Sequence, residues 1–390
     1  MGAPGWRRRG LKLPERSLFV ASAPGRVDFL NTHQDYKGLP VVPVAVNLRT
    51  YVAVVERSER FEVESVNLRE EGLAHRDSFS AGSPPLLEKG WWGNYLRAVV
   101  RAVEEHLGRP LGGGFRAVIH SEVPVGSGLS SSAALEVAFA KALDHFFNLG
   151  LRPEELAELA FQAENRIAGI PCGRLDQYAS ALGGAILLHP RPPVRVQPLP
   201  VRGLSFAVVD SGIRHSVADI HPRRQEEINR GLRALMSSGE VPGELKARLG
   251  YRFDEPTWEE LRPSDLEPYL GLVDEVSRRR ILFTLLMHES TLRAVEALRR
   301  GDVAGLAAEV NKQHELLRDL YEVSTPELER IRNSMLEAGA LAVKISGAGM
   351  GGSLLALALG REERVLEAGL RAGAARGWVL SVDEGARIEG

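Results

Sequence analysis

Hydrophobic residues recur along the chain at two spacings, which predict two kinds of element. The helical spacing of three and four residues follows residue 134, at Leu135, Ala138, Phe139, Ala142, Leu143 and Phe146. It returns after Pro153, at Leu156, Leu159, Ala160, Ala163 and Ile167, and this second helix is predicted to stop at Gly169. Short apolar runs predict strands at 18–22, 115–121, 184–189, 204–209, 340–346 and 353–359, and a strand, turn and strand at 41–55.

The second half of the chain is predicted to be richer in helices. Their ranges are 222–236, 276–300, 303–320 and 325–338. A stretch with five prolines, residues 190–200, separates them from the first half and is the best candidate for a domain boundary. We therefore predict two domains, at residues 18–195 and 200–390.

Composition narrows the classes of protein that the chain can belong to. With 390 residues, 44% of them hydrophobic, the chain can bury a large core. A formal charge of −2 gives no electrostatic reason to expect a nucleic acid or a membrane surface as partner. The single cysteine, Cys172, cannot form an intramolecular disulfide, and no signal peptide or apolar run of membrane-spanning length is present. These features predict a cytoplasmic protein.

The stretch Pro124-Val125-Gly126-Ser127-Gly128-Leu129-Ser130-Ser131-Ser132-Ala133-Ala134 has the composition of a phosphate-binding loop. Glycines allow backbone N–H groups to turn toward an anion, hydroxyls add donors, and the helix that follows directs its positive N-terminus to the same point. A flexible Gly/Ser linker would lack the apolar strand and amphipathic helix that flank this stretch. It is not the common P-loop, because no Lys-Ser/Thr pair follows the second glycine.

Five other segments carry candidate chemistry. Residues 23–38 concentrate Arg26, Asp28, His33 and Asp35 between apolar runs, which is typical of a site, although the aspartates could simply cap turns. Glu164 borders the buried face of the second helix, where a carboxylate needs a cation, either a salt-bridge partner or a metal.

In a turn-rich stretch, Asp176 follows Arg174 by two residues, an arrangement suited to a general base near a phosphate. Trp91 and Trp92, at the start of a helix, are either core residues or a wall for an adenine. The glycine turn at 347–352 is either a tight hairpin or a second loop that faces an anion.

Together these motifs resemble the GHMP superfamily of small-molecule kinases, and more narrowly its galactokinase branch. Residues 124–134, 347–352 and 23–38 match the three superfamily motifs. Segments that match the galactokinase branch are 92–95 (Trp-Gly-Asn-Tyr), 163–165, 171–173 with 176–177, 214–216, 317–319, 321–324 and 326–328. The resemblance implies an α+β fold of two domains with the active site between them.

The resemblance also implies roles for individual residues. Asp176 would be the base that faces the anomeric hydroxyl, and Arg26 would stabilise charge on the transferring phosphoryl group. ATP would be held by the loop residues Gly126, Ser127, Gly128, Leu129, Ser130, Ser131 and Ser132, with Trp92 as the wall of the adenine. Ser131 or Ser132 would ligate Mg²⁺ together with Glu164. The sugar would lie against Thr32, His33, Asp35, Gly173, Arg174 and Asp176.

Two departures from the galactokinase pattern concern the sugar. Galactokinases carry Gly-Glu-His-Thr-Asp-Tyr where this chain has Asn31-Thr32-His33-Gln34-Asp35-Tyr36, so Thr32 replaces the family's sugar-binding glutamate. The position of a sugar-facing tyrosine before the paired arginines 223 and 224 falls at Ile220, within one residue of alignment. Loss of the glutamate predicts a sugar altered at carbon 6. A hexuronate is the leading specific prediction, with Thr32 as a donor and Arg174 as its cation if Arg174 points inward rather than to solvent; the alternative is a galactokinase with a rebuilt pocket.

Three functions therefore compete. The first is an ATP-dependent sugar 1-kinase for galactose, a related hexose or a hexuronate, acting as a monomer or homodimer. The second is a sensor that binds sugar and ATP without turnover, which the presence of Arg26, Asp176 and Glu164 argues against. The third is a GHMP kinase for an isoprenoid or amino-acid alcohol, which the galactokinase-type segments argue against.

Overall fold

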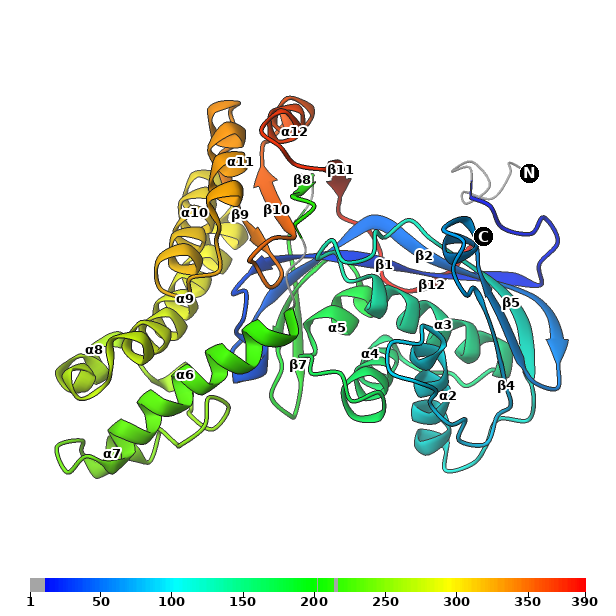
Figure 1. Cartoon of the computed structure of the whole chain (residues 1–390), viewed down its shortest axis with the longest axis horizontal. Coiled ribbons are helices and arrows are strands. Elements are labelled where there is room, and N and C mark those ends of the chain that lie inside the picture. The colour runs from blue at the N-terminus through cyan, green and yellow to red at the C-terminus, as the bar shows by residue number, and fades with distance from the viewer. Residues whose placement is uncertain (1–10, 202, 214–216) are drawn as a thin grey trace.

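A large antiparallel-rich sheet forms the first half of the molecule (Figure 1). The computed structural model describes residues 11–201, 203–213 and 217–390. The sheet has the order β12-β1-β2-β5-β3-β4, with β6 pairing β2 and β7 pairing β6. Its strands are β1 (Phe19–Leu30), β2 (Val42–Ser58), β3 (Phe61–Ser65), β4 (Arg76–Phe79), β5 (Gly114–Ser121), β6 (Ala185–His189), β7 (Arg195–Leu199) and β12 (Arg387–Ile388).

The predicted strand, turn and strand at 41–55 is wrong, because β2 is one continuous strand. Apolar side chains recur through it, and its partners on both sides, β1 and β5, satisfy the backbone over nearly its whole length. A register shift between Val54 and Glu56 lets the strand bend without breaking. β5 shows the expected alternation, with Phe115, Ala117 and Ile119 buried.

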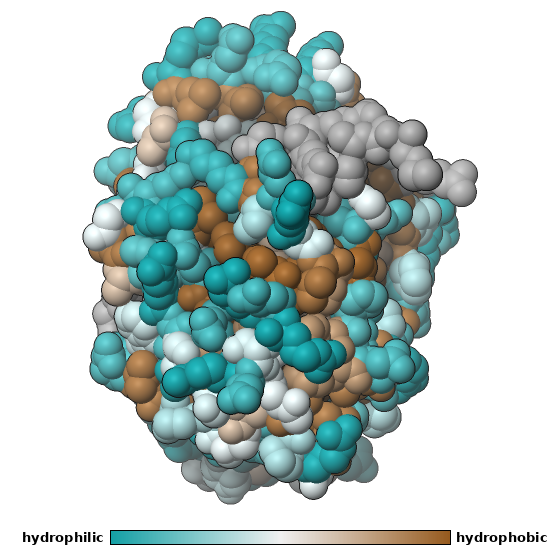
Figure 2. All heavy atoms as spheres, turned by 90° about the vertical axis from the view of Figure 1, so that its right-hand side faces the viewer, coloured by the Kyte–Doolittle hydropathy of each residue, from teal (hydrophilic) through white to brown (hydrophobic). Residues whose placement is uncertain are grey.

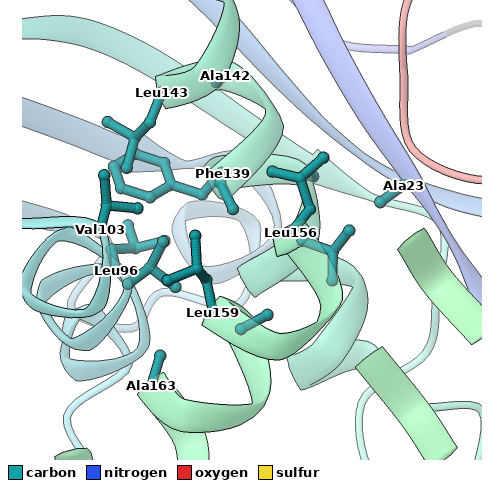
Figure 3. Close-up of a cluster of buried hydrophobic side chains, with 14 of the residues drawn as sticks. Ala23, Leu96, Val103, Phe139, Ala142, Leu143, Leu156, Leu159 and Ala163 are labelled. Carbon is teal, nitrogen blue, oxygen red and sulfur yellow. The ribbon is translucent and has the colours of Figure 1, made fainter. Parts of the chain in front are cut away.

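Helices cover one face of this sheet. They are α2 (Gly93–Leu107), α3 (Ser131–Phe147), α4 (Pro153–Gln162) and α5 (Leu175–Leu182), while the short α1 (Val66–Glu70) joins β3 to β4. Figure 3 shows the core between them, where Leu96 and Val103 of α2 approach Phe139 and Leu143 of α3 and Leu159 of α4. α4 continues as a single π-helical turn, Ala163–Ile167, and Gly169 at φ +69° follows that turn.

The second half contains a four-stranded antiparallel sheet of order β11-β8-β10-β9. Its strands are β8 (Ser205–Asp210), β9 (Ala342–Ser346), β10 (Ser353–Leu357) and β11 (Arg376–Ser381). The helices packed on or near it are α9 (Glu275–Arg300), α10 (Val303–Asp319), α11 (Pro326–Glu337) and α12 (Glu362–Arg371). The predicted helices of this half are present with shifted ends, whereas α12, β11 and β12 were not predicted.

A helical arm extends from the second half (Figure 1). It comprises α6 (Val217–Ser237), α7 (Gly243–Lys246), α8 (Pro263–Leu266), short turns at Trp258–Glu260 and Glu267–Leu272, and the start of α9. Its own core includes Ile228, Leu232, Trp258 and Ile281, all buried. The packing of α6 within the arm fixes the position of its first turns. Residues in these turns, such as His221 and Gln225, therefore reach the space between the two halves.

The two halves are tied together by more than one segment. β7 lies inside the predicted Pro-rich boundary and pairs with β6, and β12 returns from the end of the chain to pair with β1. Arg49, fully buried on β2, donates to Asp383 and to the carbonyls of Glu384 and Gly385. The division at 195–200 stays a prediction.

Hydrophilic and hydrophobic residues are interspersed over the face shown in Figure 2, which lies at the right of Figure 1. Large exposed hydrophobic side chains, such as Leu18, Leu73 and Leu87, are scattered along the described chain. Among the described residues, no helix is both long enough and apolar enough to cross a membrane.

Candidate active site

A cavity of about 570 Å³ lies where the two halves meet. Strand β1, the loop before α3, the start of α5, the start of α6 and the β9–β10 turn all contribute to its wall. The residues that line it include Arg26, Asp28, Thr32, His33, Asp35, Tyr36, Gly126, Gly128, Ser130, Ser131, Ser132, Asn165, Cys172, Gly173, Asp176, His221, Gln225, Phe253, Gly347 and Ala348. Most of the residues proposed from sequence therefore lie around one cavity.

The loop before α3 directs the start of that helix into the cavity. Gly126 and Gly128 have φ of +68° and +77°, and Ser130, the residue before the helix, has φ +63°. Glycines adopt these left-handed conformations at no steric cost, and they bring the loop backbone close to the cavity. Ser127 and Leu129 do not line the cavity: the Ser127 hydroxyl donates to the carbonyl of Pro124, and the Leu129 side chain is in the core.

The turn at 347–352 is both a hairpin and part of the site. Ser346 and Ser353 pair at the ends of β9 and β10, so the glycines form the connection of a hairpin. A β-carbon built on Gly347 would lie 3.6 Å from the α-carbon of Gly128, so the two glycine loops are in contact. The Ser353 hydroxyl also donates to the carbonyl of Ser127. The hairpin is confirmed, whereas an anion-facing role for this turn, which lines the cavity at Gly347 and Ala348, stays a prediction.

Arg26 and Asp176 form an ion pair at the centre of the cavity. The Nε and Nη2 atoms of Arg26 each lie 2.7 Å from Oδ1 of Asp176, and Nη1 donates to the carbonyl of Gly128. The Ser130 hydroxyl donates to the other oxygen, Oδ2. Three donors therefore orient a carboxylate at the N-terminus of α3.

Asp35 and Gly173 are in direct contact. A β-carbon built on Gly173 would lie 1.6 Å from Oδ2 of Asp35, so any larger residue at this position would have to displace that carboxylate. Burial, reinforced by the nearby carboxylates of Asp28 and Asp176, raises the pKa of Asp35 to about 7. Backbone N–H groups of Tyr36 and Leu175 partly offset the cost of burying this carboxylate.

His33 connects residues 23–38, here called the substrate segment, to the second half of the chain. Its Nε2 lies 3.0 Å from the carbonyl of Ala348, which makes Nε2 the protonated nitrogen. Burial, with His221 and Lys37 nearby, holds the pKa of His33 well below its usual value, so the ring is neutral. His33 and Asn31 both have positive φ, a conformation that asparagine tolerates where the galactokinase pattern has glycine.

Glu164 is buried beside the phosphate loop. Its carboxylate accepts from Nε2 of Gln177 at 2.5 Å and interacts with the Ser132 hydroxyl and the Cys172 thiol. Burial, with Asp176 as a second cause, raises the pKa of Glu164 to about 7. No salt bridge to Glu164 is present among the described side chains, although a second buried carboxylate, Glu136, shares Gln177 with it. The salt-bridge alternative for Glu164 is thus not what the structure shows.

Arg174 does not face the cavity, which corrects the sequence-based expectation. Its Nε and Nη2 donate to the two oxygens of Glu158 at 2.8 and 2.9 Å, and its guanidinium stacks on Phe161. The side chain is absent from the lining of the cavity. Glu158 lies one turn of α4 before Phe161, and its carboxylate binds the Arg174 guanidinium through both oxygens. This ion pair holds Arg174 away from the cavity.

Trp92 is also outside the cavity lining. It packs against the core of the first half, and its ring lies 6.1 Å from that of Trp91. The role of Trp92 as an adenine wall stays a prediction. The segment 214–216 lies outside the described residues.

Sequence reasoning missed His221, Gln225 and Phe253, which line the cavity from α6 and the arm. The galactokinase pattern placed the family tyrosine at Ile220. Ile220 instead packs against the hydrophobic core of the second half, and the adjacent His221 lines the cavity. His221 lay within the stated one-residue margin, whereas nothing local in the sequence marks Phe253. Lys344 was also missed: it is fully buried on β9 with its ammonium beneath the substrate segment, and burial lowers its pKa to about 8.

Comparison with known families matches both halves of the chain. Residues 94–184 match the family model GHMP kinases N terminal domain, and residues 294–375 match GHMP kinases C terminal. Residues 12–55, which include the Asn31–Tyr36 departure, match the Galactokinase galactose-binding signature.

Curated relatives and solved structures agree with these matches. A galactokinase of Chloroflexus aggregans is 35% identical over 348 residues, covering 87% of this chain and 83% of its own length. A galactokinase of Thermotoga maritima is 30% identical over 346 residues, covering 86% and 88%. Lactococcus lactis galactokinase complexed with galactose has a TM-score of 0.79 at 23% identity, covering 95% and 94% of the two chains. L. major mevalonate kinase in complex with R-mevalonate reaches 0.65 at 21% identity, covering 98% and 99%, and likenesses at this identity concern the fold alone.

Proposed function

The chain belongs to the galactokinase family of GHMP kinases, which are phosphotransferases with an alcohol acceptor, and we propose that it is an ATP-dependent sugar 1-kinase. Its proposed substrate is galactose or a closely related hexose, which is phosphorylated at the anomeric hydroxyl. The observation that carries this proposal is the Arg26–Asp176 pair, held by Ser130 at the N-terminus of α3 inside the cavity.

The pair supplies the two functions that phosphoryl transfer to a hydroxyl requires. A carboxylate oxygen of Asp176 accepts the proton of the anomeric hydroxyl as its oxygen forms a bond to the γ-phosphorus of ATP. The bond from that phosphorus to the β–γ bridging oxygen breaks, and ADP leaves with the electron pair. Arg26 stabilises negative charge on the phosphoryl group during transfer. The proton on Asp176 is then released to water.

The nucleotide would lie along the loop before α3. Backbone N–H groups of the loop, the N-terminus of α3 and the hydroxyls of Ser131 and Ser132 can surround its phosphates. The sugar would lie on the opposite wall, against His33, Asp35 and Gly173. With the anomeric hydroxyl directed to Asp176, the acceptor oxygen would meet the γ-phosphate beside that carboxylate.

A magnesium ion fits the residues present, and we include it in the proposal. Glu164 and Ser132 offer adjacent hard oxygen donors, and the buried carboxylate has no cation beside it among the described residues. The described residues contain no group of three or more His, Cys, Asp or Glu side chains that could hold a metal alone. Mg²⁺ usually binds one or two protein oxygens together with phosphate and water, and it would supply charge neutralisation of the phosphates.

An ADP-release assay over a panel of acceptors tests the proposed function. The panel contains galactose, glucose, arabinose, galacturonate, glucuronate, mevalonate and homoserine. We expect the highest kcat/KM for galactose or a related hexose, and a product in which phosphorus couples to the anomeric proton by NMR. Sugar and ATP binding by calorimetry without ADP release would identify a sensor and contradict the proposal. Preference for mevalonate or homoserine would contradict it in favour of another GHMP kinase.

A further inference from the structure

Asp28 is a carboxylate of the cavity wall that the proposed mechanism does not use. It lies two residues after Arg26 on β1, and the intervening residues pair with β2 without a register shift. Side chains two apart on a strand share a face, so Asp28 points to the same side as Arg26. Both line the cavity, whereas Val27 between them is in the core.

One oxygen of Asp28 has a partner and the other has none. The side chain is only 6% exposed, and one carboxylate oxygen interacts with the hydroxyl of Thr32. The other, Oδ1, is buried and has no hydrogen-bond partner among the described residues. Buried polar atoms are nearly always paired in native proteins, so an unpaired carboxylate oxygen at a cavity wall indicates a donor that arrives with a ligand.

The hydrogen bonds of Lys344 show why no protein donor reaches Oδ1. An ammonium group has three N–H donors, and those of Lys344 go to the carbonyl of Asp28 at 2.9 Å, to Oγ1 of Thr32 at 2.8 Å and to the carbonyl of Ile345 at 2.8 Å. All three are in use. Because Oγ1 of Thr32 accepts from Lys344, the single proton of that hydroxyl is directed to Asp28. Burial raises the pKa of Asp28 and the nearby ammonium of Lys344 opposes that rise, so Lys344 stabilises the charged carboxylate while leaving Oδ1 without a donor among the described residues.

The same accounting removes the charged donors, and the Thr32 hydroxyl, that a sugar carboxylate would use; the other donors of the lining, such as Gln225, are neutral. Thr32 has no proton left for a ligand, and Arg174 is bound to Glu158 away from the cavity. Arg26 is committed to Asp176 and to the carbonyl of Gly128. Among the described residues that line the cavity, no further lysine or arginine is present. A uronate would instead meet the acceptors Asp28 and Asp35.

We propose that Asp28 determines the substrate class, because its Oδ1 accepts a hydrogen bond from a hydroxyl of the bound sugar and its charge disfavours hexuronates. The inference rests on the proposed sugar-kinase function. The preferred substrate is therefore a neutral aldose, and the expectation of a uronate, made from the Thr32 replacement alone, is replaced. Thr32 acts as a positioning residue that holds Asp28 and does not itself contact the sugar.

A deoxy-sugar series with Asp28→Ala tests the hydrogen bond. In wild type, one of 2-, 3-, 4- and 6-deoxygalactose should lose about tenfold or more in kcat/KM relative to galactose, the expected cost of an unpaired charged acceptor. In Asp28→Ala the penalty for that one sugar should fall to about twofold or less, with the other penalties and the KM for ATP unchanged. An identical pattern of penalties in wild type and Asp28→Ala would overturn the inference.

Asp28→Asn tests the charge and keeps the test open if the alanine variant does not fold. Asparagine has a similar volume and can still accept from Thr32, so a folded protein is expected. Its ratio of kcat/KM for galacturonate to that for galactose should rise about tenfold or more over wild type, and an unchanged ratio would overturn the inference. Glu309→Gln, the corresponding acid-to-amide change in an ion pair with Arg293, is the matched control and should leave this ratio unchanged.

The outcomes separate this inference from the function on which it rests. If wild type does not release ADP with any of the sugars tested, the proposed function fails. If wild type phosphorylates galactose but the variants keep the wild-type patterns, only the assignment of Asp28 fails. A wild type that prefers galacturonate to galactose would also refute the inference and would return the hexuronate prediction.

Discussion

The two walls of the cavity are built in different ways. The wall proposed for the nucleotide, here called the nucleotide wall, comes mostly from one stretch, residues 126–132, in which glycines and the start of α3 present N–H groups and hydroxyls; the wall proposed for the sugar is called the sugar wall. The sugar wall is assembled from distant segments, including Asp28 on β1, Gly173 before α5 and His221 on α6. Lys344 supports it from β9 of the other sheet. On the proposed function, recognition of phosphate is thus a local property of this chain, whereas recognition of the sugar is a property of its tertiary structure.

The walls also differ in charge. Donors dominate the nucleotide wall, as an anionic ligand requires. Buried carboxylates dominate the sugar wall, where Asp28 and Asp35 suit a ligand that is rich in hydroxyl donors. Asp176 lies where the walls meet, because Ser130 of one wall and Arg26 of the other both bind it. Substitutions should therefore separate into three groups with different kinetic signatures.

The largest effect is expected at the junction. Asp176→Asn removes the proton acceptor but keeps the shape of the side chain, so turnover should fall at least about a hundredfold. The KM for ATP and the thermal midpoint should stay close to wild type. The measurement is kcat from ADP release, with calorimetry for the midpoint. Near wild-type turnover would mean that Asp176 is not the base.

A pair of glycine substitutions should separate the walls. Gly173→Ala puts a β-carbon 1.6 Å from Asp35, so the KM for galactose should rise about tenfold or more with little change in the KM for ATP. Gly128→Ala puts a β-carbon 3.0 Å from the carbonyl oxygen of Ser346, at a residue whose φ of +77° disfavours alanine. Mainly the KM for ATP should therefore rise.

Gly112→Ala is the control for both, since no atom lies within 4 Å of the position that its methyl group would occupy. Steady-state kinetics with each substrate varied in turn gives the two KM values. Equal effects of Gly173→Ala and Gly128→Ala on both substrates would contradict the separation of the walls.

Glu164→Gln should give a moderate effect confined to the nucleotide wall. If Glu164 binds magnesium, the Mg²⁺ concentration for half-maximal activity should rise about tenfold, because a neutral amide is a weaker ligand than a carboxylate. The KM for galactose should not change. Titration of activity with Mg²⁺ at fixed ATP measures the shift, and an unchanged Mg²⁺ dependence would leave Glu164 with a purely structural role.

The smallest effect concerns the pH dependence of stability on the sugar wall. The pKa of Asp35 is raised from its unfolded value of 3.8 to about 7, so between these values the folded state binds more protons than the unfolded state. Asp35 therefore lowers the free energy of unfolding progressively as the pH rises from about 4 to about 7. Asp35→Asn should remove this decline, which denaturant unfolding at several pH values can measure. Parallel pH profiles of wild type and variant would contradict the shift.

Much of the architecture could be predicted from the sequence because its signals are local. The helix after the phosphate loop was predicted from residues 135–146, and the structure has α3 at Ser131–Phe147. The end of the strand before the loop was predicted at Ser121, where β5 ends. The continuity of β2 was not predictable, because it depends on β1 and β5 pairing with both of its edges. The pairing of β12 with β1 was not predictable either, because β12 is only two residues long and pairs with a strand at the other end of the chain.

The sequence by itself determined the phosphate loop, the order of the family motifs and the identity of Arg26, Asp176 and Glu164 as candidate residues. These follow from residue type and short spacing, which need no knowledge of distant contacts. Only the tertiary structure decided where the candidates point. Arg174 turns to Glu158, and the proton of Thr32 goes to Asp28 because Lys344, far away in the chain, donates to Thr32. The reason is that each N–H or O–H group points in one direction, and the acceptor that lies in that direction is set by the fold.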